Sequence, residues 1–200
     1  MRSVCSTLIV LLTASIASVP SAAAQDGFVD ELRFGGTWAQ PEAIDSDHPE
    51  RNQAGINGEI LFAPLNFDSR AGGEGDFLNA ILTPRFHVGG TVNFSDEGTS
   101  YGYAGLTWHF GLTERLFVET SFGAAVNNGK KNGELNAAGN ELVRARLGSN
   151  VTFRESVALG FNVTESMTVL LQLDHNSHAR LFDEKNRGLT ATHLKFGYKF

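Results

Sequence analysis

Short runs of alternating apolar and polar residues recur along most of the chain, separated by glycine, asparagine and aspartate. The runs are rich in Val, Ile, Phe, Tyr and Thr, which favour β-strands, and no sustained apolar repeat of 3.6 residues indicates a long helix. The pattern therefore predicts an all-β chain with eight strands. They span about Val29 to Ala39, Ile56 to Ala63, Ala80 to Val92, Ser100 to Phe110, Arg115 to Val126, Asn150 to Asn162, Met167 to Ser177 and Leu189 to Phe200.

The fourth and the last predicted strands each have one apolar face and one polar or small-residue face. Because strand side chains point alternately to opposite sides, residues two apart share a face. In the final strand the apolar face carries Leu194, Phe196, Tyr198 and Phe200, and the opposite face carries His193, Lys195, Gly197 and Lys199. This alternation is typical both of a membrane barrel and of a soluble β-sandwich.

The connections between the strands alternate in length. Two are tight turns, Gly111 to Glu114 and Val163 to Ser166, and three are long, Gln40 to Gly55, Asn127 to Ser149 and His178 to Gly188. Outer-membrane barrels have short periplasmic turns, longer external loops and an even number of strands. Pro64 to Asn79 is the exception, because it is long where a periplasmic turn is expected.

The first residues are typical of an export signal. Arg2 supplies a positive charge, Ser6 to Val19 is apolar, and small residues at positions 22–24 precede Gln25. We expect a signal peptide over residues 1–24, which is removed, and one β-barrel domain over residues 25–200. Cys5 lies in the removed part, so no thiol chemistry is expected afterwards.

Composition narrows the class of protein further. A chain of 200 residues with 42% hydrophobic and 19% charged residues fits one domain. Its formal net charge of −6 argues against nucleic-acid binding, which needs a positive field. After removal of the signal no apolar run approaches the ~20 residues of a membrane helix. The exported product is therefore either a soluble β-protein or a β-barrel.

Two observations favour the barrel. The chain carries an export signal, and the last strand ends on the aromatic Phe200, which resembles the terminal signature read by the barrel-assembly machinery. Barrel closure also leaves no open strand edge in lipid. We therefore predict an eight-stranded antiparallel transmembrane β-barrel in the outer membrane of a Gram-negative bacterium. A secreted β-sandwich or lipocalin-like binder is the soluble alternative.

His175 and Ser177 are the strongest candidates for chemistry. They lie two apart on one strand, so they share a face with Cα atoms about 6.6 Å apart. A serine hydroxyl becomes a nucleophile when a neighbouring base takes its proton, and imidazole is a suitable base. The same spacing also arises by chance near the end of a strand, where both side chains are usually solvated.

The face that these two residues occupy adds to the argument. Apolar residues precede them on the same face of the strand, so the pair is expected at the membrane rim, looking toward lipid. Glu155 also lies among apolar neighbours and is expected opposite Leu171, Leu173 or His175. A lipid-facing carboxylate is costly without a partner. The partner is either a neighbouring histidine or a cation such as Arg154.

Several short motifs are distributed along the chain. Near the C-terminus they are His175 to Ala179, Asn186 to Thr190 and Gly197 to Phe200, and upstream they are Glu31 to Arg33, Pro84 to Gly90, Tyr101 to Trp108, Leu147 to Ser149 and Phe153 to Glu155. Together they resemble the motifs of the outer-membrane lipid A 3-O-deacylases, also described as acyloxyacyl hydrolase-like proteins. The resemblance implies an eight-stranded barrel with an active site facing the outer leaflet.

The resemblance also implies roles for individual residues. Ser177 matches the nucleophile and His175 the general base and acid, while His178, Asn186 and Gly188 match the oxyanion and substrate-binding region. His178 stands where the family has Asn, and Thr190 stands where some members carry the acid that orients the imidazole. Glu155 is the favoured replacement for that acid, with Asp183, Glu184 and Thr190 as alternatives.

The expected function is hydrolysis of the 3-O-linked hydroxyacyl chain of lipid A, a carboxylic ester, without metal or cofactor. The substrate would be lipopolysaccharide of the outer leaflet. An alternative function is a structural or lipid-binding barrel that has lost efficient catalysis because of His178 and Thr190. Whether two barrels associate as a homodimer stays open.

Overall fold

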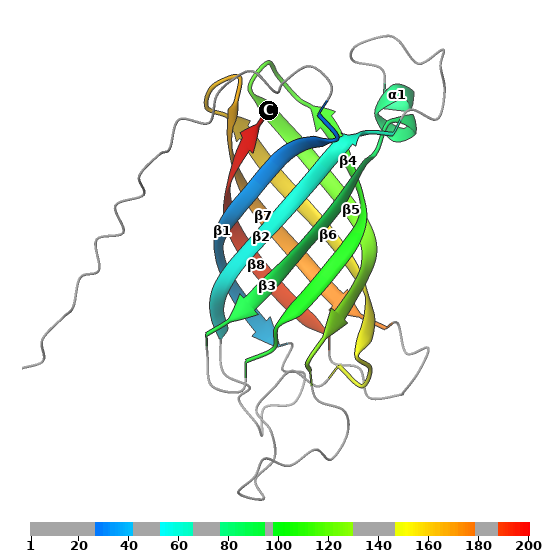
Figure 1. Cartoon of the computed structure of the whole chain (residues 1–200), viewed down its shortest axis with the longest axis vertical. Helices are drawn as coiled ribbons and strands as arrows, with labels where there is room; N and C mark the ends of the chain where they lie inside the picture. The colour runs from blue at the N-terminus through cyan, green and yellow to red at the C-terminus, as the bar shows by residue number, and fades with distance from the viewer. Residues whose placement is uncertain (1–26, 42–52, 66–76, 95–97, 130–146, 179–187) are drawn as a thin grey trace, which may run out of the picture.

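The computed structural model describes residues 27–41, 53–65, 77–94, 98–129, 147–178 and 188–200. Eight antiparallel strands form a closed barrel in chain order (Figure 1). Their bounds are β1 Val29–Pro41, β2 Gln53–Pro64, β3 Arg85–Asn93, β4 Tyr101–Gly111, β5 Leu116–Asn127, β6 Val151–Asn162, β7 Met167–Ser177 and β8 Leu189–Lys199. The predicted eight-stranded antiparallel barrel is confirmed.

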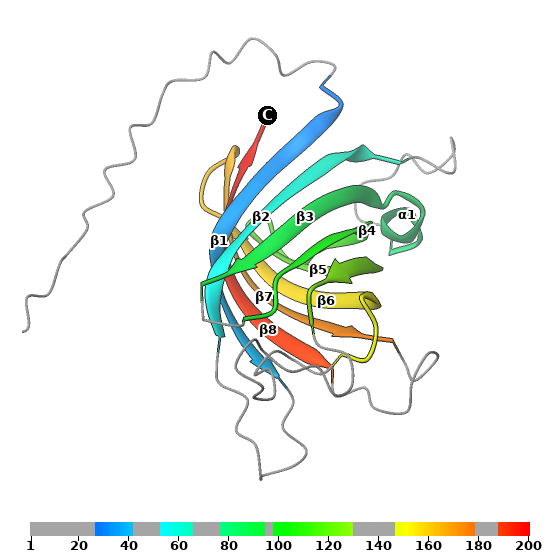
Figure 2. The ribbon, with the colours of Figure 1, turned by 60° about the horizontal axis from the view of Figure 1, so that its bottom comes forward.

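Closure occurs between the first and last strands. β1 pairs with β8 from Glu31 opposite Lys199 to Pro41 opposite Leu189. Figure 2, with the barrel tipped forward, shows the strands following one another around the wall. A β-sandwich, which has two separate sheets, is therefore the wrong alternative.

The two ends of the barrel differ. The C-terminus, the turns 112–115 and 163–166, and the helix between β2 and β3 lie at one end (Figure 1). At the opposite end β7 finishes at Ser177 and β8 begins at Leu189. The candidate residues His175 and Ser177 therefore lie at the end away from the short turns.

One predicted boundary is wrong. The third strand was expected from Ala80, but Phe77–Leu82 forms the short helix α1 and β3 begins at Arg85. Pro84 accounts for this break, because the residue before a proline is disfavoured in helical conformation. The helix lies against β4, where the Trp108 indole Nε1 donates a hydrogen bond to the Ile81 carbonyl at 3.1 Å.

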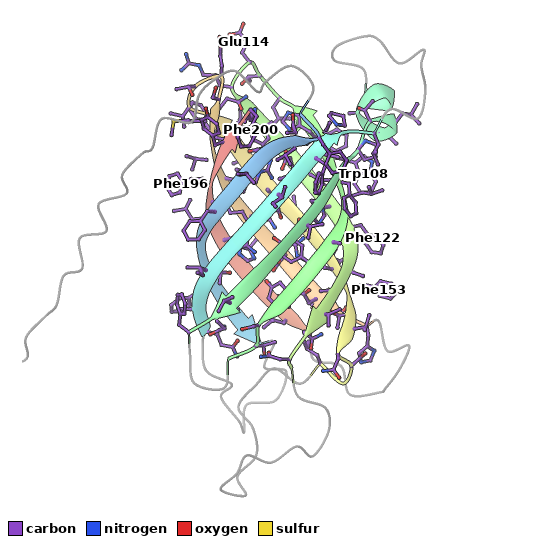
Figure 3. All side chains as sticks on the ribbon, in the orientation of Figure 1. Trp108, Glu114, Phe122, Phe153, Phe196 and Phe200 are labelled. Carbon is purple, nitrogen blue, oxygen red and sulfur yellow. The ribbon has the colours of Figure 1, made fainter. Side chains whose placement is uncertain are left out.

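Burial separates the two faces of the wall. The outer face is apolar: Phe122, Phe153 and Phe196 project away from the barrel in Figure 3 and are 52%, 39% and 58% exposed. The inner face holds fully buried charged side chains such as Arg154 and Lys195. This arrangement is the reverse of that in a water-soluble protein and fits a wall surrounded by lipid.

Among the described residues, the structure contains no helix of the length and hydropathy needed to cross a membrane.

Ion pairs fill the barrel interior near the end that carries the turns. The Arg33 guanidinium donates to Glu119 at 2.6 and 3.0 Å and to Glu31 at 2.7 Å, and it lies 3.4 Å from Glu59. Arg85 donates to Glu31, Glu119 and Asp30. These side chains come from four strands, β1, β2, β3 and β5, and link them on the inside of the wall.

We predict that Arg33→Met lowers the free energy of unfolding by about 3–5 kcal/mol, because it removes the cation shared by three buried carboxylates and leaves their negative charge undercompensated. Urea-induced unfolding of the protein reconstituted in lipid vesicles measures this change. Arg115→Met is the control, since Arg115 is exposed in the turn before β5 and its loss should cost less than about 0.5 kcal/mol. Equal effects of the two substitutions would contradict the role of the network.

Candidate active site

The odd-numbered residues of β7 form a column on the outer wall. The column is apolar from Met167 to Leu173 and then becomes polar at His175 and Ser177, which are both partly exposed. The even-numbered neighbours of this pair, Asp174 and Asn176, are completely or almost completely buried inside the barrel. The predicted outward orientation of His175 and Ser177 thus agrees with the pattern of burial.

The strand register places three polar residues in one row. Glu155 of β6 lies opposite His175, and His175 lies opposite Thr190 of β8. Directly opposed side chains on one face of an antiparallel sheet have Cβ atoms about 4.5–5.5 Å apart. Of the three positions open to Glu155 from the sequence, the structure selects the one beside His175. Ser177 lies one step farther along, opposite Phe153.

A hydrogen bond fixes the imidazole of His175. Its Nδ1 lies 3.0 Å from the hydroxyl oxygen of Thr190. In the tautomer that carries hydrogen on Nδ1, this group donates to Thr190 and Nε2 carries a lone pair. That is the protonation state required of a general base acting through Nε2.

Gly188 lies against the other side of the imidazole. Its φ of +69° belongs to the left-handed region, which glycine enters without strain. A Cβ atom at this position would lie 2.6 Å from Cε1 and 3.0 Å from Nε2 of His175. Only a glycine therefore leaves room for the ring in this position.

A pocket of about 330 Å³ opens beside this row. Its polar side is formed by Glu155, His175 and Thr190, and Val157 and Leu173 form its apolar wall. A larger apolar groove of about 690 Å³ runs over β8, β1, β2 and β3, but it contains none of the candidate catalytic residues. The smaller pocket is therefore the one that combines reactive groups with an apolar surface.

Of the other predicted site residues, one has a buried side chain and three lie outside the described residues. His178 follows β7, and its side chain has no exposed surface. Asp183, Glu184 and Asn186 lie outside the described residues. Among the residues that the structure does describe, no group of three or more His, Cys, Asp and Glu side chains is arranged to hold a metal ion.

Sequence reasoning missed how Thr190 contributes. A threonine at this position predicts the loss of an orienting acid, whereas its hydroxyl lies within hydrogen-bond distance of His175 Nδ1. The available signal was its position as the first outward residue of the last strand. Without the register between β7 and β8, that signal did not identify its partner.

The comparisons with known proteins bear on this site. The model of a family described as lipid A 3-O-deacylase (PagL) matches residues 97–199, more than half of the chain. The chain belongs to the lipid A 3-O-deacylase family. The matched region includes Glu155, His175, Ser177 and Thr190. A search of curated protein sequences finds no match.

Solved structures show the same fold as this member of the lipid A 3-O-deacylase family. The crystal structure of the outer membrane enzyme PagL is 16% identical, with a TM-score of 0.51, covering 86% of this chain and 99% of that one. A de novo designed transmembrane β-barrel is 10% identical, with a TM-score of 0.50, covering 88% and 99%. At these identities the likeness concerns the fold alone.

Proposed function

We propose that this protein is an outer-membrane esterase that removes the 3-O-linked hydroxyacyl chain of lipid A, and that Ser177 and His175 perform the reaction at the lipid-facing rim. The observation that carries the proposal is the row of Glu155, His175 and Thr190 on an outer wall whose exposed residues are mostly apolar. Polar groups there face lipid rather than an aqueous channel, so a lipid ester is the substrate that they would meet. Membership in a family described as lipid A 3-O-deacylase supports lipid A as that lipid.

The location follows from the same features. An N-terminal signal peptide over residues 1–24 would export the chain to a Gram-negative outer membrane, and the strand ending at Phe200 would be read by the barrel-assembly machinery. The end with the short turns would face the periplasm, as in other outer-membrane barrels. Ser177 would then lie at the depth of the outer leaflet, where lipopolysaccharide is found. A homodimer is compatible with this arrangement.

The first half of the reaction transfers the acyl chain to serine. Ser177 Oγ attacks the ester carbonyl while His175 Nε2 takes its proton, and a tetrahedral oxyanion forms. The C–O bond to the sugar then breaks, and the imidazolium returns the proton to the leaving sugar oxygen. The products are a free sugar hydroxyl and a hydroxyacyl ester on Ser177.

The second half uses water. His175 takes a proton from a water molecule, whose oxygen attacks the acyl-serine carbonyl, and the acid leaves as Ser177 regains its proton. Water is the only co-reactant, so the proposed route requires no metal or cofactor. The oxyanion would be held by groups near Gly188, with Asn186 and His178 as the other proposed donors. Gly188 is favoured because it lies directly against the imidazole, whereas the His178 side chain is buried.

Two residues would share the work of the usual orienting acid. Thr190 can fix the ring orientation and tautomer through its contact with Nδ1, but a neutral hydroxyl adds little stabilisation to an imidazolium. Glu155, opposite His175, can supply the negative charge. Asp183 and Glu184 remain the alternative carboxylates. This division would allow catalysis although Thr190 stands where some family members carry an acid.

Ser177→Ala is predicted to lower deacylation by about 10³-fold or more, because it removes the nucleophile. The measurement is release of 3-hydroxy fatty acid from purified lipid A in detergent, followed by mass spectrometry. Ser166→Ala, in the turn at the opposite end of the barrel, is the control and should retain full activity. Full activity in a folded Ser177→Ala protein would refute the assignment, and a folded but inactive wild type would favour the lipid-binding alternative.

Glu155→Gln and Thr190→Val are each predicted to lower kcat about tenfold, because each removes one of two modest stabilising interactions with His175. The matched controls are Glu165→Gln, in the turn between β6 and β7, and Thr192→Val, the next outward residue of β8. Steady-state kinetics on lipid A measures all four. An unchanged kcat in Glu155→Gln would shift the role of the acid to Asp183 or Glu184.

A further inference from the structure

A buried ion pair joins β6 and β7 directly behind the candidate site. The Arg154 Nε donates to Asp174 Oδ2 at 2.8 Å, and both side chains are at most 1% exposed. Arg154 precedes Glu155 and Asp174 precedes His175 in the chain. Because strand side chains alternate, the pair lies inside the wall at the same height as the proposed catalytic groups outside it.

Asp174 is also held from other strands. The Tyr101 hydroxyl of β4 donates to its carboxylate at 3.1 Å, and His193 Nε2 of β8 lies 3.2 Å from it. The Nδ1 of His193 lies 2.7 Å from the Thr37 hydroxyl of β1. One carboxylate thus connects β7 to β4, β6 and β8, and through His193 to β1.

Arg154 has equally little freedom. Its guanidinium carbon lies 3.8 Å from the centre of the Tyr103 ring, within the range of a cation–π interaction. Tyr103 in turn donates to Glu59 at 2.9 Å. The arginine is therefore fixed between an aromatic ring on β4 and a carboxylate on β7.

We propose that Arg154 and Asp174 are positioning residues for the reaction on the opposite side of the wall; this inference rests on the proposed function. Fixing these two side chains holds β6 and β7 at the height where Glu155 faces His175. A misplacement of about 1 Å can lower an enzymatic rate by about 10²-fold. The ion pair acts through the backbone and has no contact with substrate in this account.

A second ion pair in the barrel provides a comparison. Lys195 Nζ lies 3.1 Å from Glu59 Oε2, with side chains that are 0% and 4% exposed. This pair is as buried as Arg154 and Asp174, but it connects β8 to β2 rather than β6 to β7. A role limited to filling and stabilising the interior predicts similar consequences for both pairs.

The test removes both partners of each pair, because a single substitution would leave an uncompensated buried charge. Arg154→Met with Asp174→Asn is expected to lower kcat on lipid A about 10–100-fold with KM changed less than about twofold. The control, Lys195→Met with Glu59→Gln, keeps a side-chain oxygen that can accept from Tyr103 and should keep kcat within about threefold of the wild type. Folding of each variant is checked by the shift in gel mobility between boiled and unboiled samples.

Two further measurements separate positioning from loss of stability. Adding Glu155→Gln to the Arg154 and Asp174 double variant should lower kcat less than Glu155→Gln does in the wild type, because the carboxylate is already misplaced. In protein with ¹⁵N-labelled histidine, the Nδ1 resonance of His175 should move in that double variant and not in the control. This measurement does not depend on activity.

The outcomes distinguish the two proposals. A folded double variant with wild-type kcat and an unmoved His175 resonance overturns the positioning role. Equal losses of kcat in both double variants also overturn it. An inactive wild type whose His175 resonance still responds only to the Arg154 and Asp174 substitutions overturns the esterase, while the structural link between the ion pair and His175 stands.

Discussion

The guanidinium of Arg33 donates to two buried carboxylates and lies within ion-pairing distance of a third, from three different strands, inside a wall whose outer surface is apolar. A charge in such an interior is tolerated only when it is paired, so the strands that contribute to this network must present these residues to the inside at matching heights. This constraint fixes which face of each strand looks outward. The apolar band around the barrel follows from it, because the alternate residues are then free to contact lipid.

The same constraint makes polar residues on the outer face informative. Arg154 and Asp174 are paired inside the barrel. The residues that follow them in the chain, Glu155 and His175, therefore face outward. The network of ion pairs thus lies on the inner side of the wall, and the candidate site lies on its outer side. A lipid ester can approach this site laterally within the membrane, without entering the barrel.

Much of the fold could be predicted from the sequence because a period of two residues is a strong local signal. It located the strands, their faces and the outward orientation of His175 and Ser177. The period does not determine the register of the strands, because register depends on pairing between residues that are distant in the sequence. Three positions opposite Glu155 were therefore compatible with the sequence. The helix over Phe77–Leu82 was missed because a six-residue segment with five apolar positions does not distinguish a short helix from a strand. The contact between Thr190 and His175 was missed because it also depends on the register between two strands.

The central claim is that this protein hydrolyses an ester of lipid A by breaking the bond between the acyl carbon and the sugar oxygen. It is tested most directly by incubating the folded protein with lipid A in water enriched in ¹⁸O and measuring the masses of both products by mass spectrometry. The account predicts a lipid that has lost one hydroxyacyl chain and carries no ¹⁸O, with one ¹⁸O atom in the carboxyl group of the released hydroxy acid. An unchanged lipid, or ¹⁸O on the sugar, would contradict it.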